Sequence, residues 1–406
     1  MTITELDRYI VTGRRAGAAT ESAFRVMYMS DNGFELYIHI PFCVRKCLYC
    51  DFLSFPADDA IKEKYVESLC EEIMCASEER LNASLSSVFI GGGTPSILPG
   101  EAIRKIMDCV RGAFKIDADA EITIECNPGT VSSEKLKIYR ECGINRISFG
   151  LQSADDAELK RLGRIHTFGD FQSSYEMAVS AGFTNINVDL MSDIPGQTLA
   201  SWEDTLRRVC GLKPAPAHIS AYSLIVEEGT PFGDMQEEGT LDIPDEETDR
   251  EMYHMTSRIL SEYGYERYEI SNYAKPGFEC RHNIGYWTGV PYYGAGIDAA
   301  SYYDGSRYVD TDDIESYIRD PGACHYLTEK LGTDDLMSEY MILGLRMIKG
   351  VSCSVFEERF GMPLKDKYGH RIEGFVKDGL LEENGDRVKL TEKGLDLANV
   401  VMRAFI

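Results

Sequence analysis

Six short β-rich runs alternate with helical stretches through the first half of the chain, and this alternation limits the folds open to it. The runs begin at Glu35, Ser86, Glu121, Asn145, Asn185 and Ala217. Six βα units in series predict a parallel sheet with right-handed crossover connections. We therefore expect an α/β fold, either a partial barrel or a doubly wound sheet.

The alternation of β-runs and helical stretches ends after about residue 240. A long acidic helical stretch leads there to a region rich in Gly, Tyr and Pro, and the end of the chain reads as helices around LLEENGDRVKLT. Asn-Gly between two β-like runs is a strong hairpin signal, and helices with a hairpin resemble a small winged-helix module. We expect four parts: an N-terminal extension (1–32), a core domain (33–240), an α+β accessory region (241–330) and a winged-helix-like domain (331–406).

Charge and cysteine usage restrict the class of protein. The formal net charge is −25, and an acidic surface repels phosphate backbones, so we expect no nucleic-acid partner. The balanced charge of the winged-helix-like module favours packing or docking to a partner over DNA binding. No apolar stretch is long enough for a transmembrane segment, and the start lacks a secretion signal. Twelve scattered cysteines without such a signal indicate reduced thiols, so we expect a cytoplasmic protein.

One group of cysteines is spaced like a set of metal ligands. In HIPFCVRKCLYCDF, from His39, Cys43, Cys47 and Cys50 follow a C-x3-C-x2-C spacing directly after the first β-run. Thiolates suit zinc or iron–sulfur clusters. Three of them can hold three corners of a cubane and leave one iron open to a chelating ligand. Structural zinc needs four ligands, usually in two Cys pairs, and only His39 is at hand as a fourth. The context favours a [4Fe–4S] cluster.

Polar residues recur where successive β-runs end. GGGTPS, from Gly91, follows the second run, Glu125 ends the third, Gln152 follows the fourth with Arg164 beyond it, and Asp189 lies in the fifth. The carboxyl ends of parallel strands meet on one face, where (β/α) barrels assemble their active sites. Each residue alone also fits a helix cap or a hydrogen-bonded core group. Together they predict a site on one rim.

With these motifs the sequence resembles the radical SAM proteins of the HemN/HemW group, from about Glu35 to the C-terminus. The resemblance implies a partial (β/α)6 TIM-like barrel, a [4Fe–4S] cluster and bound S-adenosyl-L-methionine (SAM). It also implies that SAM is contacted at nine positions: Tyr37, Tyr49, Gly92, Gly93, Thr94, Glu125, Gln152, Arg164 and Asp189.

Two branches of this group differ at the cysteine loop. The oxygen-independent coproporphyrinogen III oxidases carry a fourth cysteine where this chain has Phe52. The chain is more similar to the heme chaperone branch, whose loop ends in CDF and which carries an H-N-x-x-Y-W motif, here His282, Asn283, Tyr286 and Trp287. An imidazole can ligate heme iron and aromatic rings can stack on a porphyrin. The residues alone fit equally well a helix capped by His282 and Asn283, with core aromatics; the resemblance favours heme binding.

One segment departs from the family pattern. In GAGIDAAS, Gly294 to Ser301, the resemblance predicts a sequence closer to GIGPGAHS, so Ala300 stands where a histidine is expected and Asp298 where a glycine is expected. If that histidine binds heme or shapes the pocket in the family, this chain lacks it. The sequence then leaves open whether the chain binds heme differently or binds another tetrapyrrole. Cys280 is either a compensating ligand or a small residue without a special role.

The preferred hypothesis is a heme chaperone that binds heme near His282 and passes it to acceptor hemoproteins, including respiratory ones at a membrane surface. The alternatives are the oxidative decarboxylation of coproporphyrinogen III in heme biosynthesis, or a HemN-like radical SAM methyl transfer, so the sequence leaves open whether the chain is an enzyme. Both enzymes predict substrate-dependent cleavage of SAM, whereas a chaperone predicts heme binding without porphyrin turnover.

Overall fold

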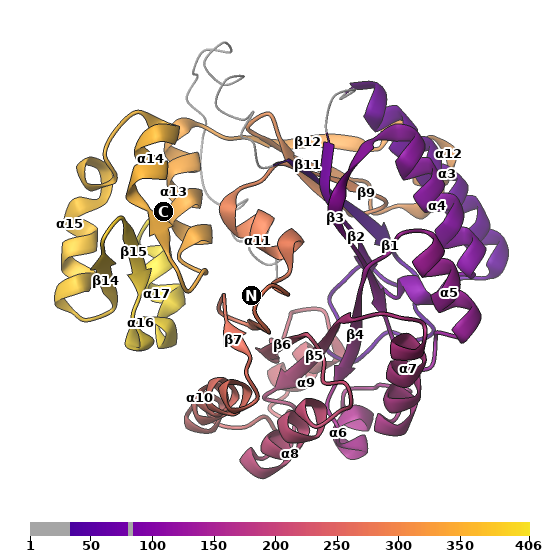
Figure 1. Ribbon diagram of the computed structural model, residues 1–406, viewed down its shortest axis with the longest axis horizontal. Coiled ribbons are helices and arrows are strands. Elements are labelled where there is room, and N and C mark those ends of the chain that lie inside the picture. Colours follow the sequence, from indigo (N-terminus) through magenta and orange to yellow (C-terminus); the bar gives the residue numbers. More distant parts are fainter. Residues whose placement is uncertain (1–32, 80–83) are drawn as a thin grey trace.

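The computed structural model describes residues 33–79 and 84–406, so the predicted N-terminal extension lies outside the described residues. Its main feature is a twelve-stranded sheet in the order β12-β11-β10-β9-β1-β2-β3-β4-β5-β6-β8-β7 (Figure 1). A second sheet of three strands, in the order β13-β15-β14, belongs to the C-terminal region.

Six neighbouring parallel strands form the centre of the large sheet. They are β1 (Phe34–Ile40), β2 (Ser84–Gly92), β3 (Lys115–Cys126), β4 (Arg146–Gln152), β5 (Asn185–Ser192) and β6 (His218–Ser223). Each predicted β-run is confirmed as one of them. The connecting segments contain α3 (Asp59–Glu79), η1 (Pro95–Ile97), α4 (Gly100–Ala113), α5 (Ser133–Glu141), α6 (Asp156–Arg161), α7 (Phe168–Ser180) and α8 (Leu199–Cys210).

The helices that connect the six strands lie on one side of the sheet, as Figure 1 shows for α3, α4, α5, α7 and α8, whereas α11 (Arg281–Thr288) lies on the other side. This arrangement decides between the two predicted architectures, because a doubly wound sheet carries helices on both faces. The strand pattern agrees with it. On β4, Ile147, Phe149 and Leu151 are fully buried in the apolar core, and the alternate side chains face the other side of the sheet. The central fold is a partial (β/α)6 TIM-like barrel.

The accessory region extends this sheet at both edges. The last helix of the predicted core domain is α9 (Pro231–Glu237). The elements of the accessory region are α10 (Glu246–Glu262), β7 (Glu266–Arg267), β8 (Asn272–Ala274), α11 (Arg281–Thr288), β9 (Tyr292–Ala295), β10 (Ala300–Tyr303), β11 (Ser306–Asp310), α12 (Ile314–Arg319), η2 (Pro321–Ala323) and β12 (His325–Lys330). β9 pairs with β1 in parallel, and β8 pairs with β6 antiparallel. Strands from both sides of the predicted boundary near residue 240 thus share one sheet, and that boundary stays a prediction.

The C-terminal region has its own apolar core, which includes Leu345, Phe356 and Phe405. Its elements are α13 (Thr333–Gly344), β13 (Val351–Ser352), α14 (Cys353–Phe360), α15 (Leu364–Lys377), β14 (Leu381–Asn384), β15 (Arg387–Leu390), α16 (Glu392–Asp396) and α17 (Ala398–Arg403). The predicted hairpin is confirmed as β14–β15, with Gly385 at a φ of 60° in the turn. The winged-helix assignment of this α+β unit stays a prediction.

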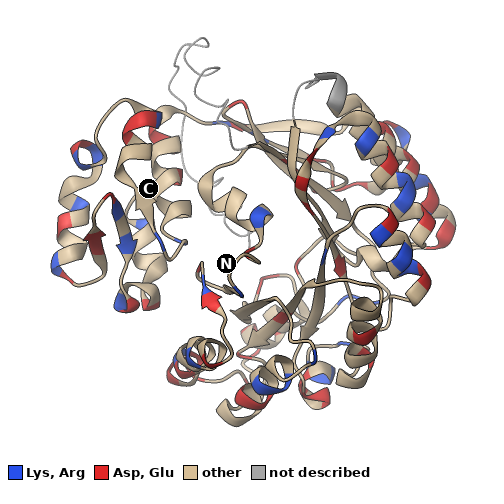
Figure 2. Cartoon of the chain, in the orientation of Figure 1, with Lys and Arg blue, Asp and Glu red and all other residues tan. Residues whose placement is uncertain are grey.

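Basic and acidic residues are interleaved along the outer helices (Figure 2). Arg104 pairs with Glu141 between α4 and α5, and Arg207 pairs with Glu203 within α8. Within residues 33–79 and 84–406, no helix has the length and apolarity that crossing a bilayer requires. All twelve cysteines are free thiols.

Candidate functional site

The cysteine loop lies between β1 and α3, at the carboxyl ends of the strands. Cys43, Cys47 and Cys50 are half-buried and line a cavity of about 180 Å³, here called the rim cavity. Backbone hydrogen bonds hold the loop: Cys43 N–H donates to Phe55 O at 3.1 Å, and Leu48 N–H donates to Leu162 O at 3.1 Å. The first bond closes the loop on itself, the second ties it to the residue after α6 (Asp156–Arg161), and three thiols face one cavity.

The geometry of the loop separates a cluster from a zinc ion. Both ring nitrogens of His39, the imagined fourth zinc ligand, are engaged, with Tyr37 Oη 3.0 Å from Nδ1 and Leu53 O 3.1 Å from Nε2. Among the described residues, no group of three His, Cys, Asp or Glu is spaced to hold a single ion. A cubane instead takes one thiolate on each of three irons, so the three thiols fit a [4Fe–4S] cluster.

Two glycines bring the backbone after β2 against this loop. Gly92 has a φ of 106°, and a Cβ there would lie 2.6 Å from the His39 ring. A Cβ on Gly93 would lie 2.9 Å from Phe42 O and 3.1 Å from Cys43 Sγ. Only glycine fits at these distances, so the GGG backbone packs directly against the cysteine loop.

Eight of the nine residues predicted to contact SAM line the rim cavity, and Tyr37 is the exception. Arg164 connects several of them, since Nη2 donates to Tyr49 Oη at 3.1 Å and Nη1 donates to Asn127 Oδ1 at 3.0 Å. Asn127 in turn donates to Thr94 Oγ1 at 2.8 Å. Arg164 Nε is buried without a partner among the described residues. The cavity thus combines fixed polar groups with a free donor, which fits a polar cofactor such as SAM.

Gln152 ends β4 with a φ of 74°, in the left-handed region that non-glycine residues rarely adopt. The pairing of β4 with β5 is irregular at this point, between Gly150 and Gln152. Tyr222 Oη donates to Gln152 Oε1 at 2.8 Å, which fixes the side chain in the cavity. Strained backbone of this kind is concentrated at ligand-binding sites.

Glu125 is the carboxylate between the glycine loop and β5. Gly92 N–H donates to Glu125 Oε2 at 3.1 Å. Burial, and then the nearby Asp189, raise the pKa of Glu125 to about 8. Asp189 is itself held by Ser148 Oγ at 2.9 Å and by Asn187 Nδ2 at 2.8 Å. Glu125 is therefore protonated at neutral pH in the free protein, and a cationic ligand would favour its ionised form.

The raised pKa predicts a pH-dependent effect of Glu125→Gln on stability. Glu125 binds a proton more tightly in the folded chain, so its stabilising contribution is complete near pH 4.5 and is lost as pH rises through about 8. Glutamine does not titrate. We expect Glu125→Gln to gain roughly 1–3 kcal/mol in free energy of unfolding relative to wild type between pH 5 and pH 8.

Urea unfolding of the full chain without SAM, measured across this pH range, checks the expectation. The matched control is Glu176→Gln on the exposed side of α7, which should track wild type at every pH. A difference between Glu125→Gln and wild type that stays constant with pH would contradict the shift.

A second cavity, of about 250 Å³ and here called the lumen cavity, lies inside the barrel. It shares Phe52, Gly92, Glu125 and Asp189 with the rim cavity, so the two spaces adjoin. Its lining also includes Tyr37 and three of the four predicted heme-binding residues, which are His282, Asn283 and Tyr286. Phe52, the residue that replaces the fourth cysteine of the oxidases, thus stands between the cysteine loop and the H-N-x-x-Y-W helix.

His282 is buried on α11 and hydrogen-bonded at both ring nitrogens. Nδ1 lies 2.8 Å from Ser87 Oγ and 3.7 Å from Glu35 Oε2, and Nε2 lies 3.1 Å from Tyr286 Oη. Burial, and then the positive Arg146, lower the pKa of His282 to about 3, so the imidazole is neutral at physiological pH. The capping alternative is wrong for His282 and Asn283, because the N-cap residue of α11 is Cys280 and both residues lie within the helix.

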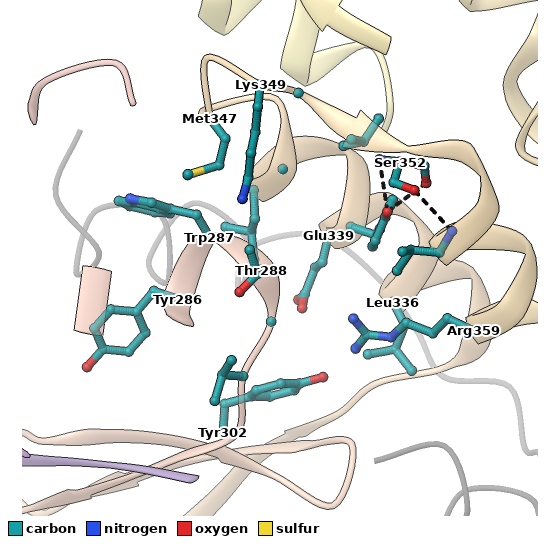
Figure 3. A pocket seen from close by; sticks show the side chains of 18 of the residues that line it. Tyr286, Trp287, Thr288, Tyr302, Leu336, Glu339, Met347, Lys349, Ser352 and Arg359 are labelled. Atoms are coloured by element: carbon teal, nitrogen blue, oxygen red, sulfur yellow. Dashed lines mark hydrogen bonds between the residues drawn. The ribbon is translucent and has the colours of Figure 1, made fainter. Parts of the chain in front are cut away.

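Trp287, the last residue of the motif, faces a different cavity of about 220 Å³ between α11 and the C-terminal region (Figure 3). The Arg346 guanidinium lies 4.2 Å from the centre of the indole ring. Tyr286 lines both this cavity and the lumen cavity. The structure therefore brings three of the motif residues together and separates the fourth from them.

The departures from the family pattern also lie at the lumen cavity. Asp298, with a φ of 59°, and Ala300 are both part of its lining. Cys280 Sγ lies 3.3 Å from Glu121 Oε1, and Cys280 lines neither the rim nor the lumen cavity. The idea of Cys280 as a compensating ligand gains no support from this position.

Sequence reasoning missed several lumen residues, among them Arg146, Asn187 and Phe89. The available signal was the two-residue period of the β-runs. On β4 the residues that face the barrel interior are Arg146, Ser148, Gly150 and Gln152. Only Gln152 was predicted as a site residue, because the prediction rested on residues at strand ends.

Comparisons with known proteins agree with this geometry. The family model of the radical SAM superfamily matches residues 37–209, and that of the HemN C-terminal domain matches residues 331–397. The heme chaperone HemW of Bacillus subtilis is 37% identical over 374 residues, covering 91% of this chain and 98% of that protein. HemW of Escherichia coli is 33% identical and covers 92% and 98%, respectively.

A solved structure of coproporphyrinogen III oxidase (HemN) from Escherichia coli superimposes with a TM-score of 0.81 at 22% identity, over 96% of this chain and 93% of that one. This likeness confirms the predicted TIM-like fold. The identity to the HemW proteins over nine-tenths of the chain determines the branch, and the radical SAM membership implies a [4Fe–4S] cluster and SAM as cofactors. The chain belongs to the HemW family of radical SAM proteins.

Proposed function

We propose that this protein is a heme chaperone, which binds heme in the lumen cavity and transfers it to acceptor hemoproteins. The observation that carries the proposal is the position of His282, a neutral imidazole on the wall of a cavity that adjoins the cysteine loop. Relatives named heme chaperone HemW, at 32–37% identity, support it.

The surroundings of His282 suit an iron ligand. Ser87 and Glu35 lie on the Nδ1 side of the ring, and such partners commonly orient metal-ligating histidines. The other nitrogen, Nε2, has Tyr286 Oη as its partner. Binding of iron at Nε2 would need only the displacement of this hydroxyl. Tyr37, Phe89 and Tyr292 add aromatic surface to the cavity, against which a porphyrin face can stack.

The cofactors have their own places beside this cavity. Cys43, Cys47 and Cys50 would hold the cluster, and the polar residues of the rim cavity would hold SAM. When bound, the pair supplies one-electron reductive cleavage of SAM. Phe52, Gly92, Glu125 and Asp189 form the boundary between this chemistry and the lumen.

An anaerobic heme titration, followed by Soret absorbance of the cluster-loaded protein, tests the proposal. We expect saturable binding by wild type and binding weaker by about tenfold or more for His282→Ala. The matched control is His218→Ala, since His218 is also buried and hydrogen-bonded, to Asn187 and Tyr268, but lines neither cavity. No binding, or binding indifferent to His282, would refute the proposal and direct attention to 5′-deoxyadenosine formation with coproporphyrinogen III.

Tyr286→Phe gives a prediction of opposite sign. The hydroxyl of Tyr286 is the hydrogen-bond partner of His282 Nε2. Its removal leaves Nε2 without the partner that the iron would have to displace. One hydrogen bond contributes about 1 kcal/mol, so the heme dissociation constant should fall by about fivefold. The same Soret titration checks this, with Tyr340→Phe in the C-terminal region as control. Weaker binding by Tyr286→Phe would contradict Nε2 as the coordinating atom.

We further propose that the protein acts in the cytoplasm, where its twelve free thiols stay reduced, and that its acceptors include hemoproteins at a membrane surface. Transfer to a purified apo-hemoprotein, measured as the spectrum of the acceptor, tests this second half of the proposal. Heme that stays on the chaperone in the presence of excess acceptor would count against transfer.

A further inference from the structure

The inward face of the barrel is polar, which is unusual for this fold. The interior of a complete TIM barrel is filled by layers of branched apolar side chains. Here one inward layer, joined by strand pairing, runs Glu35, Ser87 and Glu121 on β1 to β3, and another runs Ser148 and Asn187 on β4 and β5. Ser148 and Asn187 line the lumen cavity, whereas the other three contact His282, which lines it. The interior is thus built to hold a polar or charged ligand.

Arg146 is the positive charge of this interior. It is the first residue of β4, is 2% exposed and lines the lumen cavity. Its Nε is fully buried, and within the described residues its guanidinium forms no hydrogen bond or ion pair. A desolvated guanidinium normally has a carboxylate or phosphate as its partner. The missing partner therefore points to an anionic group of a ligand.

The acidic side chains nearby are already bound by other donors. Both carboxylate oxygens of Asp189 accept hydrogen bonds, from Ser148 Oγ and Asn187 Nδ2. Glu121 Oε1 has Cys280 Sγ at 3.3 Å and the backbone N–H of His282 at 3.4 Å. These acids balance the charge of Arg146 at a distance and leave its planar donor fork directed at no protein oxygen.

We infer that Arg146 binds a carboxylate of the ligand in the lumen cavity, through paired hydrogen bonds from its guanidinium. This inference rests on the proposed function, where the carboxylate is a propionate of the tetrapyrrole. His282 would then hold the iron and Arg146 the edge of the same ligand, since both line one cavity. If only aromatic rings contacted the porphyrin, its propionate carboxylates would have no hydrogen-bond partner in the cavity.

SAM is the other source of a carboxylate at this site, through its methionine portion. Position favours the tetrapyrrole. Arg146 begins β4, whereas Gln152, which faces the rim cavity, ends it. Six residue steps of extended strand span roughly 20 Å, so the backbone of Arg146 lies deeper in the barrel than the strand ends that carry the rim cavity. A SAM molecule chelating the cluster would have its carboxylate at the loop.

The test compares heme with heme dimethyl ester, in which both propionates are neutral. Full-length, cluster-loaded wild type should bind the diacid about tenfold or more tightly than the diester, as expected for a charge-assisted bidentate contact. Arg146→Met should weaken diacid binding to the level of the diester. Arg146→Lys, which keeps the charge but not the fork, should retain part of the preference. SAM affinity should stay within about twofold of wild type in both variants.

Arg267→Met is the control for the loss of an arginine outside the lumen cavity. The iron content and the melting temperature of each variant report whether it is folded. Equal binding of diacid and diester by wild type, with His282 still required, would overturn the inference and leave the proposed function standing. Loss of SAM binding in Arg146→Met with the diacid preference intact would assign the carboxylate to SAM. Absence of any heme binding would refute both.

Discussion

A Cys47→Ser protein is expected to lose its iron–sulfur cluster and every activity that depends on it. Four cysteines line the rim cavity, and Cys126 is the one outside the loop; it is 2% exposed and held at the end of β3, so we do not expect it to replace the missing ligand. Serine is a poorer ligand for iron because its hydroxyl is harder and less acidic. Iron and acid-labile sulfide after anaerobic reconstitution should fall by about tenfold or more, together with cleavage of SAM by a reductant.

Cys353→Ser is the matched control for this experiment. Cys353 is a half-buried free thiol at the start of α14, in the C-terminal region, and lines none of the rim cavity. Its variant should keep a full complement of iron and sulfide. A Cys47→Ser protein that retained an intact cluster and SAM cleavage would refute the assignment of the ligands.

Gly285→Ala is expected to displace α11 while leaving the cluster in place. A Cβ at Gly285 would lie 2.0 Å from Glu35 Oε1 and 2.4 Å from Glu35 Cδ, and Glu35 is only 2% exposed. Alanine would ordinarily stabilise a helix by about 1 kcal/mol relative to glycine. Here the overlap reverses the sign, and we expect a loss of about 2–4 kcal/mol in the free energy of unfolding.

Heme binding should suffer more than stability does. His282 and Tyr286 lie on the same short helix as Gly285, so a shift of α11 moves both away from Ser87 and the lumen cavity. The measurements are urea unfolding, iron content and the Soret titration. Gly374→Ala on α15 is the control, because a Cβ there would meet no atom within 4 Å. Wild-type heme affinity in Gly285→Ala would show that the position of α11 does not matter for binding.

Local patterns made the barrel predictable. In each of the six β-runs the apolar residues lie on one face of an extended strand, and the helical stretches between the runs have the length of βα crossovers. The parallel direction of the six strands therefore followed from the sequence. The choice between barrel and doubly wound sheet did not, because it depends on which face of the sheet the helices cover.

Residues close in sequence were also predictable as a site, whereas cavities were not. Cys43, Cys47 and Cys50 lie within one loop, and their spacing alone indicated a shared ligand. The division of the H-N-x-x-Y-W motif between two cavities depends on the angle at which α11 crosses the barrel, which no local pattern encodes. Arg146 was not predicted for a related reason. A single basic residue at the start of a strand indicates no site until the structure shows that it is buried without a hydrogen-bond partner in the described part of the chain.

The polar interior of the barrel has a thermodynamic consequence. The strands bury one row of apolar residues against the outer helices, and the lumen side combines aromatic rings with polar groups that a ligand can contact. A ligand of this cavity is bound by the folded chain alone, so its occupancy raises the free energy of unfolding with the logarithm of its free concentration. At a hundred times its dissociation constant, such a ligand adds about 2.7 kcal/mol. Cargo supply would thereby set how long each carrier molecule survives in the cell.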